Sequence, residues 1–298
     1  MTIEVENLYR DFGRHEALRG LSLTVPRGSA YALIGANGAG KTTTIKTVMN
    51  IITPTRGSTR ILGVDSRSLG VAQLQRIGYV SENQELPRRL TVAQYLEYLR
   101  PFYPSWDREL ERSVLGELRL PADRRMGDLS HGMRIKMALA CALPFRPEVL
   151  ILDEPFSGLD SLVRDEFMAR LLQQAGEMTI LISSHELSEI EGITTHVGFI
   201  DQGRLLFQES MSELSDRFRQ VRITLSAPGR VPEPTPPGWL DTSLAGNVVS
   251  FVDSQFTEAT LAASVAALFH GVRSIDVQPI DLRAIFTTLA RAARGGTS

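Results

Sequence analysis

Apolar and polar residues alternate near the start of the chain, and this pattern predicts antiparallel strands. Ile3 to Val5 and Leu21 to Val25 both alternate, and Pro26 to Gly28 supplies a turn after them. Unbroken apolar runs, in contrast, are typical of strands buried on both faces of a parallel sheet. Such strands are expected at 31–34, 149–152 and 179–182, with further strands at 58–62 and 77–80. The pattern therefore predicts an α/β core with an antiparallel β subdomain.

The spacing of apolar residues becomes helical between Thr91 and Leu118, with an interruption at 101–107. This predicts a helical subdomain at about 83–145, inserted between strands of the core. Its aromatic residues suit either a groove for a partner or packing within a small helical layer, which is the commoner use. These residues are Tyr95, Tyr98, Phe102, Tyr103 and Trp106.

The last third of the chain predicts a separate small domain. A hairpin at 197–207 and a helix at 211–218 end the first domain, which we place at 1–215. Residues 216–298 then predict an α+β accessory domain. Its expected elements are strands at 221–225, 247–251 and 272–277, a proline-rich loop at 227–238, and helices at 261–269 and 282–293.

Composition narrows the class of protein. The 298 residues are 43% apolar and 22% charged, with a net charge of −2 and no basic block, so we expect no nucleic-acid partner. The first residues lack the pattern of a signal peptide, and no apolar run approaches the ~20 residues of a spanning helix. A role at a membrane would thus need another chain. The single cysteine, Cys141, fits a reducing compartment and a place in the core.

A glycine-rich loop lies between the strand at 31–34 and a helix that begins near Lys41. The spacing G-x-x-x-x-G-K-[ST] is met by Gly35, Gly40, Lys41 and Thr42. Glycines let backbone N–H groups approach phosphate oxygens, and the helix N-terminus adds its positive dipole. Lys41 is expected to reach the β- and γ-phosphates and Thr42 to ligate Mg²⁺. The loop therefore predicts a nucleotide triphosphate site.

Two acids and a histidine follow buried strands of the same sheet. Asp153 and Glu154 end the strand at 149–152, and His185 ends the strand at 179–182. Ligands bind at the carboxyl ends of such strands, so Asp153 can hold Mg²⁺ and Glu154 can polarise the water that attacks the γ-phosphate. An imidazole there can contact the γ-phosphate. Ser130 is a good helix N-cap before the apolar run to Leu143.

Taken in order, these motifs resemble the nucleotide-binding domain of ABC transporters over roughly residues 1–215. The resemblance implies a P-loop ABC ATPase cassette with a mixed sheet core, whose cofactors are ATP and Mg²⁺. It identifies Glu154 as the catalytic glutamate, His185 as the switch histidine, and Thr42, Asp153 and the Q-loop position Glu82 as metal ligands. Asp160 falls in the D-loop, and Ser130, Gly132 and Met133 fall in the signature that contacts ATP on another subunit. The implied ATP-binding residues are Phe12, Gly35, Asn37, Gly38, Ala39, Gly40, Lys41, Thr42 and Thr43.

Three motifs depart from the usual family pattern. Phe12 stands where the family has the aromatic residue that stacks on adenine, and it lacks a hydroxyl. From the residues alone, Tyr9 and Phe12 each suit packing on a sheet face as well as stacking on adenine. The signature reads Leu-Ser-His-Gly-Met, so His131 and Met133 replace the usual glycine and glutamine. Glu82 replaces the usual Q-loop glutamine. Together with residues 102–107 and 163–167, the signature methionine resembles bacterial ABC-2-type exporter ATPases.

The resemblance implies an ATPase that powers an exporter through a separate transmembrane permease subunit. Its second partner is another copy of itself or a paralogous ATPase, arranged head to tail. The chain is then expected to be cytoplasmic and peripheral on the inner face of the cell membrane. Similar extensions in the family join the two subunits or regulate them. For this accessory domain, a passive cover on the cassette is an equal alternative. A soluble ABC-type ATPase acting on ribosomes or DNA is the alternative; those relatives carry two cassettes or a long coiled coil, neither of which is present here.

Overall fold

The computed structural model describes residues 1–82, 84–157, 159, 164, 166–168, 171, 178–186, 189 and 192–295. The chain divides into two compact units, Met1–Gln208 and Glu209–Ser298. Each unit has its own sheets and its own hydrophobic core. Within the described part of the chain, no helix is both long and apolar enough to cross a membrane.

A six-stranded sheet forms the centre of the first unit, with the order β10-β9-β3-β8-β7-β6. Its strands are β3 (Ala30–Ile34), β6 (Ile77–Ser81), β7 (Val149–Asp153), β8 (Thr179–Ser184), β9 (His196–Asp201) and β10 (Arg204–Ser210). Strands β9, β3, β8, β7 and β6 pair in parallel. Every residue of β3, β7 and β8 is buried, as expected from their apolar runs. Their carboxyl ends therefore meet along one edge.

A second sheet is antiparallel, with the order β2-β1-β4-β5. It comprises β1 (Ile3–Phe12), β2 (His15–Val25), β4 (Arg56–Ile61) and β5 (Val64–Asp65), and β4 begins before the predicted 58–62. Helix α1 (Lys41–Val48) connects the two sheets through one hydrophobic core, because Ile45 and Val48 cluster with residues of β1 and β7. The mixed sheet and the antiparallel subdomain predicted from the sequence are thus confirmed.

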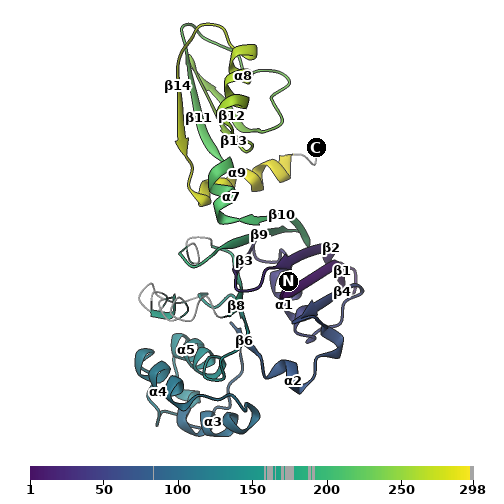
Figure 1. Cartoon of the computed structure of the whole chain (residues 1–298), viewed down its shortest axis with the longest axis vertical. Coiled ribbons are helices and arrows are strands. Elements are labelled where there is room, and N and C mark those ends of the chain that lie inside the picture. Colours follow the sequence, from purple (N-terminus) through teal and green to yellow (C-terminus); the bar gives the residue numbers. More distant parts are fainter. Residues whose placement is uncertain are drawn as a thin grey trace. The chain divides into compact units, whose positions relative to one another are not determined.

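The predicted helices of the insertion are present as α3 (Val92–Leu99), α4 (Arg108–Glu117) and α5 (His131–Ala142). They gather on one side of the unit, away from the antiparallel sheet, and the short α2 (Val71–Leu74) lies before β6 (Figure 1). Helix α5 begins directly after the predicted N-cap Ser130, whose side chain accepts a hydrogen bond from the Met133 N–H. The Cys141 side chain is buried in this helix.

The aromatic residues of the insertion divide between the two alternatives. The Tyr103 ring stacks on Phe145 at 4.1 Å, and Trp106 donates a 2.7 Å hydrogen bond to Glu111. Tyr98 and Phe102 instead pack edge to face at 5.4 Å, and each is more than half exposed. Tyr103 and Trp106 therefore belong to the packing of the helical layer, and Tyr98 and Phe102 lie on its surface.

The second unit is an α+β domain, as predicted. Its elements are α7 (Met211–Arg217), β11 (Arg219–Leu225), β12 (Trp239–Ala245), β13 (Val248–Asp253), α8 (Glu258–Leu268), β14 (Val272–Pro279) and α9 (Leu282–Gly295). The strands form an antiparallel sheet of order β12-β13-β11-β14, and α8 lies against it (Figure 1). Trp239 stacks on Phe251 at 3.7 Å in the core between them. Strand β12 was not predicted.

Candidate nucleotide site

The glycine loop between β3 and α1 has the backbone that its sequence requires. Gly38 and Gly40 have φ angles of 82° and 112°, in the left-handed region that favours glycine. A Cβ on Gly35 would lie 2.2 Å from the Ile200 carbonyl oxygen, so this position is restricted to glycine by space. The loop therefore holds its main chain close to α1, whose first turn is formed by Lys41 and Thr42.

Lys41 is buried at the start of α1, where three oxygen atoms surround its ammonium group. Its Nζ donates to the carbonyl oxygens of Gly35 at 2.6 Å and Ala36 at 3.2 Å. The Glu154 carboxylate lies 2.9 Å from the same Nζ. A buried ammonium needs such partners, and the cluster places one positive charge at the mouth of the glycine loop.

Asp153 and Thr42 meet at the carboxyl end of β7. The Thr42 hydroxyl donates to Asp153 at 3.0 Å, and the Ser183 hydroxyl donates to the same carboxylate oxygen at 2.8 Å. Burial raises the pKa of Asp153, and the hydrogen bonds from Ser183 and Thr42 oppose this shift. Because β7 and β8 are parallel with Asp153 opposite Ser183, this contact follows from the strand register.

Glu154 connects Lys41 with His185. One carboxylate oxygen faces Lys41, and the other accepts a 2.9 Å hydrogen bond from His185 Nδ1. Glu154 is 9% exposed and has a φ of 49°, an uncommon backbone conformation that concentrates at functional sites. Its own N–H donates to the Ser183 hydroxyl. Ser183 therefore orients both acids, a role that the sequence reasoning missed although Ser183 directly follows an apolar strand.

The hydrogen bond to Glu154 raises the pKa of His185, and burial opposes the shift. The folded protein thus favours the charged imidazolium, so its stabilising effect is complete below the ordinary pKa of about 6.5 and lost as pH rises through the raised value. We expect the melting temperatures of the wild type and His185→Gln to differ at acidic pH and to converge at alkaline pH. His196, which pairs with the Thr195 hydroxyl, provides the control variant His196→Gln. A His185 difference that grows with pH would contradict this assignment.

A cavity of about 340 Å³ opens beside these residues, within the usual size range of small-molecule sites. The predicted residues Phe12, Asn37, Gly38, Gly40, Lys41, Thr42, Thr43, Glu82 and Glu154 line it, together with His15 and Ala17, which sequence reasoning missed. Gly35 and Ala39 do not line it: Ala39 is buried in the core, and Gly35 lies against Ile200. Tyr9 is not among the described residues that line the cavity, whereas the aromatic residue Phe12 is.

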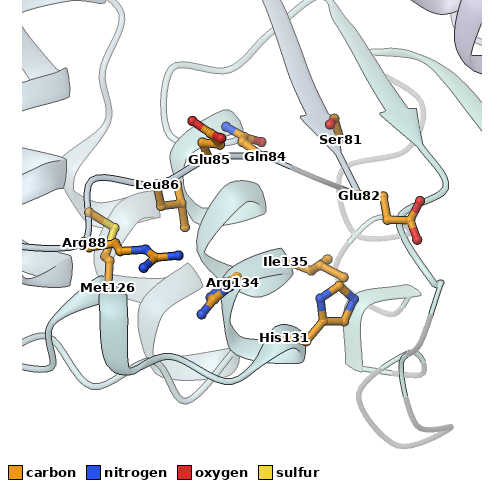
Figure 2. Close-up of a pocket in the computed structure, with 10 residues that line it drawn as sticks. All are labelled: Ser81, Glu82, Gln84, Glu85, Leu86, Arg88, Met126, His131, Arg134 and Ile135. Atoms are coloured by element: carbon orange, nitrogen blue, oxygen red, sulfur yellow. The ribbon is translucent and has the colours of Figure 1, made fainter.

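The signature residues lie elsewhere in the same chain. His131 donates from Nε2 to the Ser157 carbonyl at 3.0 Å, which links the start of α5 to the segment after Glu154. The Met133 sulfur accepts a 3.6 Å hydrogen bond from Arg124 Nη1. A second cavity, of about 600 Å³, is lined by His131, Arg134, Arg88 and Glu82 among others (Figure 2). The described wall of the smaller cavity contains no residue of 129–133. Asp160 lies outside the described residues.

The described residues hold no group of three or more His, Cys, Asp or Glu side chains placed to bind a metal ion. Thr42 and Asp153 nevertheless bring a hydroxyl and a carboxylate together at 3.0 Å. Mg²⁺ prefers such oxygen ligands and is commonly held by one or two carboxylates with substrate phosphates and water. This pair therefore fits a magnesium ion that arrives with a nucleotide.

Comparison with known proteins places the site in context. Residues 18–157 match the family model of ABC transporters. The bacitracin transport ATP-binding protein BcrA of Enterococcus faecalis is 34% identical over 223 residues, covering 73% of this chain and 72% of the relative. The ABC transporter ATP-binding protein YtrB of Bacillus subtilis is 26% identical, covering 74% and 76%.

Solved structures give the same fold. The ATP-binding subunit of an ABC transporter superposes with a TM-score of 0.66 and 29% identity, covering 72% of this chain and 92% of the other. A dimeric ATP-binding cassette in a post-hydrolysis state, bound to ADP and Pi, has a TM-score of 0.61 at 22% identity. The superposition covers 70% of this chain and 98% of the cassette. At this identity the similarity supports the fold and nothing beyond it.

Proposed function

This chain belongs to the ATP-binding subunits of ABC transporters, which hydrolyse ATP, and we propose that it powers an exporter through a separate transmembrane permease. The observation that carries the proposal is the meeting of Lys41, Glu154 and His185 at the mouth of the glycine loop. Phosphate binding, water activation and charge neutralisation need these three types of group in one place.

We assign phosphate binding to the glycine loop and Lys41. The Lys41 ammonium would exchange its 2.9 Å contact with Glu154 for the β- and γ-phosphate oxygens, while keeping its donors to the loop carbonyls. The open N-terminus of α1 adds backbone N–H groups and the helix dipole. Phe12, which lines the same cavity, is our candidate for the stacking surface of the adenine base.

Thr42 and Asp153 are our candidates for the magnesium site, and Glu82 lines the same cavity. When bound there, Mg²⁺ would neutralise charge on the β- and γ-phosphates. Ser183 holds the Asp153 carboxylate in place and donates no proton to the reaction. The elevated pKa that burial gives Asp153 makes this carboxylate dependent on nearby positive charge for its ionised form.

Glu154 is our candidate for the group that polarises the attacking water. Once Lys41 turns to the phosphates, one Glu154 oxygen is free to accept a hydrogen bond from water. The other oxygen stays bound to His185 Nδ1, which fixes the orientation of the carboxylate. In this arrangement the imidazole would stay beside the catalytic carboxylate, from where it would sense the γ-phosphate.

The site is completed by a second copy in this proposal. The Ser130 hydroxyl and the start of α5 form a helix N-terminus suited to phosphate, yet they do not line the described wall of this chain's own nucleotide cavity. A head-to-tail dimer would bring the signature of each subunit to the glycine loop of the other. Closing on ATP and opening after hydrolysis would then move the membrane partner.

The exporter role is supported by similarity to the bacitracin transport ATP-binding protein BcrA. The experiment that tests it is purification of the tagged protein from its native membranes in mild detergent, followed by quantitative mass spectrometry. We expect one multi-span membrane protein at comparable stoichiometry. Ribosomal or DNA-bound proteins as the stoichiometric partners would replace the exporter with a soluble ATPase.

A further inference from the structure

The Phe12 ring in the wall of the nucleotide cavity is covered on one face by an arginine. The guanidinium carbon of Arg10 lies 4.6 Å from the centroid of the Phe12 ring. Phe12 lines the cavity beside Lys41 and Thr42, whereas Arg10 is not among the residues of its described wall. The guanidinium occupies one face of the ring, so a base that stacks on Phe12 would use the other face. Phe12 is 47% exposed, so much of its side chain remains accessible to such a base.

Arg10 is itself fixed by the segment that follows α1. Its Nη1 donates a 2.8 Å hydrogen bond to the Thr53 carbonyl. The same segment is tied to β1 by the Thr55 N–H, which donates to the Tyr9 carbonyl, and by the Thr55 hydroxyl, which accepts from the Asp11 N–H at 3.0 Å. The helix that begins at Lys41 thus leads, at its far end, into the segment that anchors Arg10.

From this geometry we infer that Arg10 is a positioning residue for the nucleotide base, holding Phe12 between its guanidinium and the purine ring of ATP. This inference rests on the proposed role of Phe12 as the base platform. A phenylalanine has no hydroxyl with which to fix its ring, and the anchored guanidinium takes over that task. The cation also draws electron density toward its own side, which makes the open face less negative and favours stacking on an electron-rich purine.

Arg10→Met tests the inference because it keeps the aliphatic length and removes the cation. We expect its KM for ATP to rise about threefold with kcat unchanged. The KM for CTP should change less, since a pyrimidine stacks over a smaller area, so the preference for ATP over CTP falls. Arg10→Lys, which retains a cation near the ring, should recover part of the affinity for ATP.

Arg56 provides a matched control on the same sheet. Its guanidinium carbon lies 4.2 Å from the Tyr9 ring centroid, and neither residue is in the described wall of the cavity. Arg56→Met therefore removes the same kind of contact and should leave KM and kcat for ATP as in the wild type. A KM increase in Arg56→Met equal to that of Arg10→Met would overturn the inference, because the effect would then be general to the sheet.

Phe12→Ala separates failure of this inference from failure of the proposed platform. If Phe12→Ala raises the KM for ATP and Arg10→Met does not, Arg10 has no positioning role while the platform stands. If Phe12→Ala leaves the KM unchanged, the platform assignment itself is wrong and the inference falls with it. A lower kcat with an unchanged KM for ATP in Arg10→Met would also overturn the inference about Arg10.

Discussion

Glu154→Gln is expected to bind ATP as the wild type does but to hydrolyse it about a hundredfold more slowly or worse. The amide keeps the shape of the side chain and its contact with His185, but it is a much weaker acceptor for the proton of the attacking water. It also removes the carboxylate that faces Lys41 at 2.9 Å, so binding of the phosphates no longer has to displace that ion pair. Bound ATP then persists, and the dimer closed on it accumulates.

Two measurements on Glu154→Gln check this result: single-turnover hydrolysis, and size-exclusion chromatography with and without MgATP. Glu148 offers a control at the opposite end of the same strand, where it pairs with Arg76 at 2.5 Å. Glu148→Gln should retain wild-type turnover. Rapid hydrolysis by Glu154→Gln would contradict the assignment of the catalytic carboxylate, and a monomer at saturating MgATP would contradict the dimer.

Lys41→Ala is expected to weaken ATP binding by about a hundredfold, because it removes a charge-assisted contact to two phosphate groups. The substitution also leaves the buried Glu154 carboxylate without its lysine partner, so repulsion from the phosphates adds to the loss. Isothermal titration calorimetry with MgATP measures the change directly.

Lys46 is the matched control for Lys41, since it lies on the same helix one turn further from the loop. It does not line the cavity among the described residues, although its charge lowers the pKa of Asp153, so Lys46→Ala should weaken ATP binding far less than Lys41→Ala does. Near-wild-type binding by Lys41→Ala would show that the loop and α1 bind the phosphates without the ammonium, contrary to the present account.

Much of this site could be predicted because its spacing is dictated by backbone geometry. Gly40 has a left-handed backbone, and Gly35 leaves no space for a Cβ. Both positions therefore require glycine, and the motif can be recognised in the sequence. Asp153 ends a strand whose neighbours are parallel, so the carboxyl ends had to meet at one edge. The same reasoning placed His185 at the end of a strand of the same sheet as Glu154, and the two side chains are hydrogen-bonded.

Contacts between distant segments were harder to predict. Nothing in the local sequence places the Arg10 guanidinium on the Phe12 ring or the His131 imidazole on the Ser157 carbonyl. Strand β12 was missed because a shift of register between Leu240 and Ser243 breaks the alternation that reveals a strand.

In the proposed dimer, each ATP site is built from the glycine loop of one copy and the signature of another. Mixing two inactive variants, Lys41→Ala and Ser130→Arg, tests it most directly. A heterodimer would pair the intact loop of one variant with the intact signature of the other, so an equal mixture should recover about a quarter of the wild-type ATPase rate. A mixture that stays as inactive as its components would contradict a shared site between two copies of this chain.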